Sequence, residues 1–140
     1  MELQEGLDFV WARKNGVLAT IRANGRPQLS NILYVAGDDD VLRISITDTR
    51  AKTANVRRDP RVSLYVPGDN FWAYIVVEGT AELTPVAADP HDHTVEQLVA
   101  YYKAGNGEHP DWDEFRATMV ADGRLILALH PERAYGMVMG

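Results

Sequence analysis

Apolar and polar side chains alternate along much of the chain, a pattern that is typical of strands burying one face. In residues 41–47, for example, leucine and isoleucines alternate with arginine, serine and threonine. The dipeptide Asn24-Gly25 favours a tight hairpin turn between two β-rich runs. The pattern predicts strands at 16–22, 28–35, 41–47, 61–66, 72–84, 123–130 and 132–139.

Helical signals interrupt the strands at 3–13, 50–58, 92–104 and 112–122. Thr49 can cap the second of these helices, and Pro60 ends it. Asp111 and Glu114 have the spacing of a capping box at the start of the fourth. Strands outnumber helices and do not alternate with them in βαβ order. We therefore predict a single domain over residues 1–140 that is mainly β, a six- or seven-stranded antiparallel barrel with flanking helices.

Composition and motifs exclude several classes of protein. The 14 basic and 20 acidic residues give a net charge of −6, which disfavours binding to nucleic acid. No apolar run reaches the roughly eighteen residues of a membrane span and no signal-peptide pattern is present, so we expect no membrane contact and a cytoplasmic location. The absence of cysteine excludes disulfides and thiolate chemistry. His91 and His93 diverge at a helix start, so we expect no metal site.

One basic segment stands out from this acidic background. Residues 50–61 carry five cations against Asp59, a net charge of +4 that leaves −10 for the rest of the chain. Arg50 and Lys52 lie where the positive end of a helix dipole disfavours cations, unless an anion completes the arrangement. We interpret the segment as a phosphate site, to which Ser45 and Thr47 add hydroxyl groups. The alternative is a solvated helix face, with Asn55 satisfying local backbone groups.

Other polar and aromatic residues fit a ring system beside such a phosphate. Gln28, Ser30 and Asn31 interrupt an otherwise apolar strand, so their polar groups need partners. Trp72 and Tyr74 share one face of a predicted strand, where core or dimer-interface packing is the alternative interpretation.

Four stretches of the chain resemble a known superfamily. They are GVLATIRANGRPQLSNI, SITDTRAKTANVRRDPRVSLYV, WAYIVVEGTAELTP and EHPDWDEFRATMV. Together they resemble the split β-barrel flavin/deazaflavin oxidoreductases related to pyridoxamine 5′-phosphate oxidase, whose fold is the FMN-binding split barrel. Within that superfamily the chain looks most like the actinobacterial group that uses the deazaflavin coenzyme F420. The similarity runs over about residues 16–136.

The resemblance implies a homodimer with two cofactor sites at the subunit interface. It implies that the basic segment holds the phosphate, that the strand at 28–35 runs along the ring system, and that the strand at 72–84 faces the site from this subunit or its partner. The implied cofactor-binding residues are Gln28, Ser30, Asn31, Ser45, Thr47, Arg50, Ala51, Lys52, Asn55, Trp72 and Tyr74. In this view Arg57 and Arg58 are near enough to attract the glutamate tail of F420.

The implied activity is transfer of a hydride from reduced F420 to an electrophilic small-molecule substrate of the enone, quinone or tetrapyrrole type. One alternative is an FMN-dependent oxidase or reductase of the pyridoxamine 5′-phosphate oxidase type. It is less favoured because the chain lacks the arginine-rich C-terminal tail of the oxidases. A second alternative is a noncatalytic F420 carrier, because no acid–base pair is evident. Tyr34 and Tyr74 are proton-donor candidates by chemical type alone, so no catalytic residue is assigned.

Overall fold

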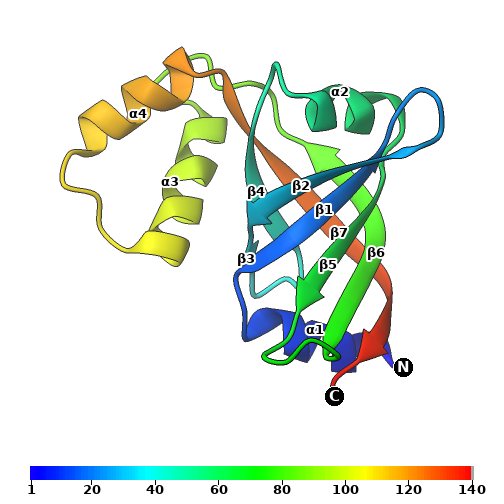
Figure 1. Cartoon of the computed structure of the whole chain (residues 1–140). Coiled ribbons are helices and arrows are strands. Elements are labelled where there is room, and N and C mark those ends of the chain that lie inside the picture. Colours follow the sequence, from blue (N-terminus) through cyan, green and yellow to red (C-terminus); the bar gives the residue numbers. More distant parts are fainter. Residues whose placement is uncertain (140) are drawn as a thin grey trace.

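The computed structural model describes residues 1–139, and over that range it contains seven strands and four helices (Figure 1). The strands are β1 (Asn15–Ile21), β2 (Pro27–Leu33), β3 (Val35–Ala36), β4 (Leu42–Thr47), β5 (Arg61–Pro67), β6 (Tyr74–Leu83) and β7 (Arg124–Met137). The helices are α1 (Leu3–Trp11), α2 (Ala51–Arg58), α3 (His93–Asn106) and α4 (Trp112–Ala121). The pattern thus predicted the type and order of nearly every element.

A single antiparallel sheet curls into a barrel. Its strand order is β2-β1-β5-β6-β7-β4-β3, and the curl brings β2 into contact with β4 without a ladder between them. Helices α1 and α2 lie at opposite ends of the barrel, while α3 and α4 lie beside it (Figure 1). The predicted fold class, a mainly β split barrel with flanking helices, is confirmed.

The pairing of β4 with β7 builds two hydrophobic clusters, one on each face. Leu42, Ile44 and Ile46 of β4 point into the barrel together with three leucines of β7 at 125, 127 and 129. Ile126 points the other way and packs under α3 and α4. Each fully buried side chain of this size stabilises the fold by about 1.5–3 kcal/mol. The continuous apolar run of β7 is therefore buried on both faces.

The two closing strands predicted at 123–130 and 132–139 are in fact one strand, β7. Its pairing with β6 shifts register between Glu78 and Gly79, which leaves Glu132 as the extra residue of a bulge. Pro131, which has no amide hydrogen, is accommodated at this irregularity. A Cβ atom on Gly79 would collide with the carbonyl oxygen of His130, so the close approach of β6 to β7 at this bulge requires glycine.

Two other strand boundaries differ from the prediction. The strand expected at 28–35 breaks at Tyr34, whose side chain is 1% exposed and donates a hydrogen bond of 2.6 Å to the carbonyl oxygen of Val10. The strand expected from Trp72 begins at Tyr74 instead. Its start is set by a turn in which the side-chain oxygen of Asn70 accepts from the amide of Trp72 at 3.0 Å.

The turn and cap predictions had mixed outcomes. The hairpin turn at Asn24-Gly25 is confirmed, with Gly25 at a φ of 86°. Asp111 caps α4 as predicted by accepting from the amide of Glu114 at 3.1 Å, but the capping box is incomplete, because the amide of Asp111 donates to Nδ1 of His109 instead of to Glu114. The Thr49 cap is wrong, because the residue at the N-cap of α2 is Arg50 and no side chain caps this helix.

We expect Tyr34→Phe to lower the free energy of unfolding by about 0.5–1.5 kcal/mol, because it removes a buried hydrogen bond while the carbonyl of Val10 keeps the backbone amide of Arg13 as a donor. Chemical denaturation measures the loss. Tyr102→Phe is the matched control, since Tyr102 is only partly buried and the substitution keeps its ring, and it should change stability by less than about 0.5 kcal/mol. Equal effects of the two substitutions would contradict the anchoring role of Tyr34.

Candidate functional site

The ends of β4 and β7 carry polar side chains on the face that points away from the barrel core. Thr47 lies directly opposite Arg124, and Ser45 lies opposite Ile126, so these side chains share one face. Helix α2 follows β4 after a short turn, which is held by a 2.7 Å hydrogen bond from the Thr53 hydroxyl to the carbonyl oxygen of Thr47. This arrangement places the first turn of α2 next to the polar face of the sheet.

A cavity of about 240 Å³ lies where β2, β4, β7 and the start of α2 meet. We call it the anion cavity. Its polar lining residues are Asn31, Ser45, Thr47, Arg50, Lys52 and Arg124. Five of these six are predicted site residues, and the structure brings them together from two strands and a helix.

Three cations in the anion cavity have no carboxylate partner. The ion pairs within residues 1–139 involve other arginines, and Arg50, Lys52 and Arg124 take part in none of them. Burial lowers the pKa of Lys52, and the charges of Arg50 and Arg124 lower it further. Like charges held together without a counterion destabilise the folded chain. The arrangement is therefore suited to an anion.

Arg124 has an unsatisfied donor in the same place. Its Nε is buried and has no hydrogen-bond partner, the one such side-chain atom in the described part of the chain. Its Nη1 lies 3.5 Å from Oγ of Ser45, which is too long for a strong hydrogen bond. The uncapped start of α2 adds backbone amides that have no acceptor within the helix. These donors fit the oxygens of a phosphate group.

Asn55 and the two arginines after it do not line the anion cavity. Asn55 is 6% exposed, and its side chain donates to Oγ1 of Thr20 at 3.1 Å and accepts from Arg58 at 3.0 Å. Arg58 also donates to the carbonyl oxygen of Ile21 at 2.8 Å, and Arg57 pairs with Asp48 at 2.7 Å. These contacts attach α2 to the barrel, so the expectation that both arginines attract a ligand tail is not supported.

The three polar residues predicted on β2 lie on two different faces. Side chains alternate along a strand, so Gln28 and Ser30 share a face with Ile32, which packs against the core. Asn31 lies on the opposite face and lines the anion cavity. It also lines a neighbouring hollow of about 460 Å³ that extends along β1 and β2 to Pro67. Ala51, in the first turn of α2, is exposed.

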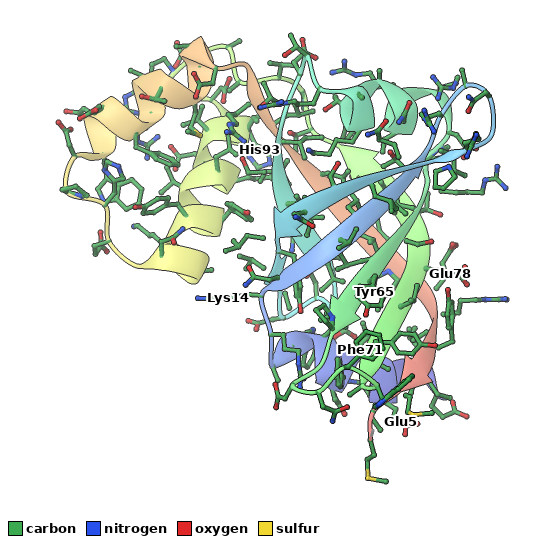
Figure 2. The ribbon with its side chains drawn as sticks, in the orientation of Figure 1. Glu5, Lys14, Tyr65, Phe71, Glu78 and His93 are labelled. Atoms are coloured by element: carbon green, nitrogen blue, oxygen red, sulfur yellow. The ribbon has the colours of Figure 1, made fainter. Side chains whose placement is uncertain are left out.

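Trp72 and Tyr74 are not brought to the anion cavity of their own chain. They lie at the end of the barrel closed by α1, where Figure 2 labels Tyr65 and Phe71, whereas the anion cavity lies at the α2 end. Trp72 is 67% exposed and lies against Phe71, and Tyr74 stacks on Tyr65 with ring centroids 5.7 Å apart.

Tyr34 is wrong as a proton-donor candidate. Its hydroxyl is fully committed to Val10, and burial raises its pKa well above the usual range, only partly offset by the charge of Arg13. Arg124, by contrast, is a residue that sequence reasoning missed. The sequence signal was a single arginine directly before the apolar run at 125–129. Only the pairing of β7 with β4 places this arginine beside Thr47.

Two observations concern metals and membranes. Within residues 1–139, no group of three or more His, Cys, Asp or Glu side chains is arranged to hold a metal ion. None of the helices in that part of the chain is long and apolar enough to cross a membrane.

The fold and the anion cavity define a split-barrel protein with a cationic site at one end of the barrel. The sequence model of the family described as pyridoxamine 5′-phosphate oxidase matches residues 3–137, and the chain belongs to this family.

Solved structures extend the comparison. An F420 reductase is 26% identical, with a TM-score of 0.69, over 91% of this chain and 94% of that one. A conserved hypothetical protein from Mycobacterium tuberculosis is also 26% identical, with a TM-score of 0.70, over 96% and 82% of the two chains. A FAD-binding protein from Mesorhizobium loti shares the fold at 20% identity, with a TM-score of 0.64 over 94% and 88%. These similarities support the split-barrel fold.

Inorganic phosphate should raise the melting temperature of the protein, because it neutralises the three cations. In Lys52→Met we expect phosphate affinity to fall about tenfold or more, the loss of a charge-assisted hydrogen bond. A titration followed by thermal unfolding measures this. Lys14→Met, which removes an exposed lysine, is the control and should keep the full phosphate effect. An undiminished phosphate effect in Lys52→Met would remove Lys52 from the site.

The same variant has a pH-dependent effect on the ligand-free protein. The pKa of Lys52 is lower in the folded chain than its usual 10.5, so the folded state binds this proton more weakly. The folded chain is therefore most stable above the usual pKa of lysine, where Lys52 is uncharged in both states. It loses this stability as the pH falls through the lowered pKa of Lys52 and the folded state takes up the charge. Ligand-free Lys52→Met should therefore be at least as stable as the parent at pH 7.

Proposed function

We propose that this protein is an F420-dependent oxidoreductase that transfers a hydride to an electrophilic organic substrate of the enone, quinone or tetrapyrrole type. The observation that carries the proposal is the anion cavity, where Arg50, Lys52 and Arg124 meet without a counterion. The similarity to an F420 reductase over 91% of the chain supports F420 as the cofactor. When bound, F420 supplies a two-electron hydride equivalent, so the protein need mainly bind, orient and shield it.

The residues of the anion cavity have separate tasks in this proposal. The three cations hold the phosphate, and the hydroxyl groups of Ser45 and Thr47 add neutral hydrogen bonds at the same face of the sheet. Asn31, which lines both the anion cavity and the neighbouring hollow, is the side chain placed to contact the ring system beyond the phosphate. Gln28 and Ser30 support the strand from its inner face. We assign the proton of the reduction to solvent.

We further propose that the protein is a homodimer and that Trp72 and Tyr74 serve the site of the other subunit. Val17, Tyr65, Val76 and Tyr135 are register neighbours on four adjacent strands, so they form an apolar row across the outer face of the sheet. Tyr65 is 38% and Tyr135 48% exposed in the single chain. A contiguous apolar surface of this kind is typical of a subunit interface.

One observation favours an FMN-dependent enzyme as the second candidate. The anion cavity gathers three positive charges, and the terminal phosphate of FMN carries nearly two negative charges at neutral pH. The anion cavity would therefore hold the phosphate of either cofactor. Binding measurements with both cofactors separate the two candidates.

The parent protein should bind F420 more tightly than FMN in matched fluorescence titrations. Lys52→Met should weaken F420 binding by about 1.5–3 kcal/mol, the range for a charge-assisted hydrogen bond, while Lys14→Met should have little effect. Anaerobic mixing with reduced F420 and a panel of enones or quinones should reoxidise the cofactor. Tighter binding of FMN would favour the flavin candidate, and F420 binding without turnover on any acceptor would favour a carrier.

Sedimentation at low micromolar concentration should show a dimer, because an interface centred on an apolar row is expected to be large and stable. Tyr65→Arg places a charge in the middle of that row and should shift the equilibrium to monomer. Ala104→Arg, which adds the same charge at an exposed position of α3, is the control and should remain dimeric. A parent protein that sediments as a monomer would contradict the dimer and the cross-subunit role of Trp72.

A further inference from the structure

A second cavity lies on the other side of Arg124. Helices α3 and α4 cover the outward face of β4 and β7 but leave a space of about 370 Å³ above it. We call it the α3–α4 cavity. Its walls include Tyr101, Tyr102, Phe115 and Met119, and its polar members are Ser45 and Arg124, which also line the anion cavity. The two cavities therefore meet at a shared arginine and a shared serine.

The aromatic walls of the α3–α4 cavity are held by packing and by a hydrogen bond. Phe115 is 8% exposed and meets Tyr102 edge-on, with ring centroids 5.1 Å apart. Tyr101 donates a 2.8 Å hydrogen bond to the carbonyl oxygen of Leu33, and burial raises its pKa. These contacts leave the aromatic walls little freedom to collapse into the space. The cavity is therefore largely formed without a ligand, as small-molecule sites usually are.

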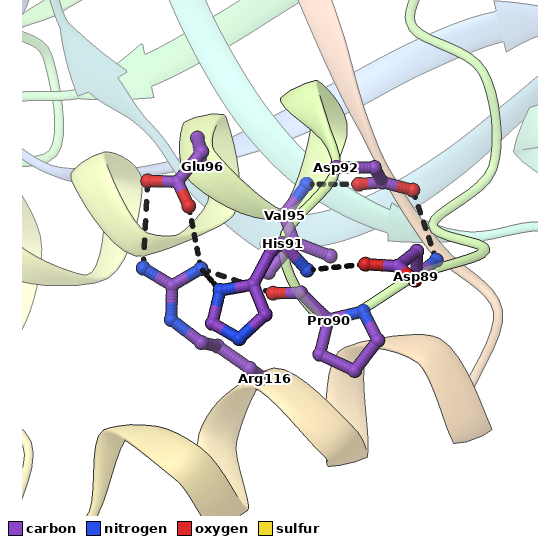
Figure 3. Close-up of polar contacts among 7 residues, drawn as sticks. All are labelled: Asp89, Pro90, His91, Asp92, Val95, Glu96 and Arg116. Atoms are coloured by element: carbon purple, nitrogen blue, oxygen red, sulfur yellow. Dashed lines mark hydrogen bonds and ion pairs between the residues drawn. The ribbon is translucent and has the colours of Figure 1, made fainter.

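Polar contacts also join α3 and α4 at their junction (Figure 3). Arg116 of α4 donates to the carbonyl oxygen of Pro90 at 3.0 Å and to Oε1 of Glu96 on α3 at 2.6 Å. Asp92 caps α3 by accepting from the amide of Val95 at 2.8 Å. The Arg116 contacts thus attach α4 to α3 and to the segment before it, while the Asp92 cap fixes the start of α3.

The chemistry of the lining specifies what this cavity accepts. Aromatic and thioether walls favour the faces and edges of a planar apolar ring. Arg124 brings a permanent positive charge into this setting. A guanidinium group has five N–H donors, so one arginine can meet an anion in each of two neighbouring cavities. A phosphate in the anion cavity that accepts from Nε leaves other N–H groups of Arg124 for an anionic group in the α3–α4 cavity.

We propose that the α3–α4 cavity is a second ligand site, separate from the anion cavity, and that it binds a small aromatic carboxylate. The ring lies among Tyr102, Phe115 and Met119, and the carboxylate accepts hydrogen bonds from Arg124. The volume suits one or two fused rings. The site does not depend on which cofactor the anion cavity binds. Because both cavities use Arg124, occupancy of one changes the affinity of the other.

The test uses 2-naphthoate as the probe and 2-naphthamide as its neutral counterpart of similar shape. Calorimetric titration of the full chain should show naphthoate binding about tenfold or more tightly than the amide, the ratio expected for a charge-assisted hydrogen bond. Arg124→Met should remove that preference and leave binding of the amide within about twofold. Lys52→Met, the control in the neighbouring cavity, should preserve the preference.

A second pair of measurements locates the probe. Met119→Trp fills the cavity and should abolish binding of both compounds, with circular dichroism confirming that the variant is folded. In the parent protein, the methyl resonance of Met119 should shift on addition of naphthoate, which tests the site even if the variant does not fold.

Three outcomes would overturn the proposal. They are equal binding of the acid and the amide, an unmoved Met119 resonance at saturating probe, and loss of the naphthoate preference in Lys52→Met, which would place the probe in the anion cavity. The F420 titration uses neither probe, so failure of the proposed function can be distinguished from failure of the second-site proposal.

Discussion

The antiparallel pairing of β4 with β7 is the interaction on which the core, the anion cavity and the covering helices all depend. Its inward face joins three residues of β4 to three leucines of β7. Its outward face sets Thr47 opposite Arg124 and seats Ile126 under α3 and α4. Since side chains alternate strictly along both strands, a register slip of one residue would move the polar set into the barrel and the leucines out of it. The apolar burial of one face thus holds the polar residues of the other in position.

The folded protein keeps an unfavourable repulsion among positive charges at the anion cavity. Elsewhere in the described chain five arginines form ion pairs, as in the pairs of Arg43 with Asp39 and Arg61 with Asp59. The three cations of the anion cavity have no such partner, and the pKa of Lys52 is lowered mainly by burial. An acidic protein has many carboxylates with which to neutralise this group, so the unpaired charges are best explained by a ligand that completes it. The strong hydrophobic pairing beneath them makes this cost tolerable.

Much of the fold was predictable because it depends on local patterns. Alternation identified the strands, the Asn24-Gly25 turn identified the first hairpin, and Asp111 identified the start of α4. The errors come from contacts with other segments, which the alternation of apolar and polar residues does not encode. Tyr34 interrupts a strand because its hydroxyl bonds a residue 24 positions away, and β7 continues through Pro131 because the bulge opposite Gly79 accommodates it. Periodicity reports which face is buried, but it does not report which distant segment covers that face.

The features of the candidate site likewise divide into those that the sequence predicts and those that only the folded structure shows. The sequence by itself determined the basic segment, the polar face of β4 and, through resemblance, the family. Only the tertiary structure decided that Arg124 joins Lys52, that Asn55 and Arg58 attach α2 to β1, and that the face of β2 with Asn31 is the one at the anion cavity. Residue type and helix position reveal the charge of a segment. Which of its side chains reach the ligand depends on strand register and on contacts between residues tens of positions apart, and these exist only once the chain has folded.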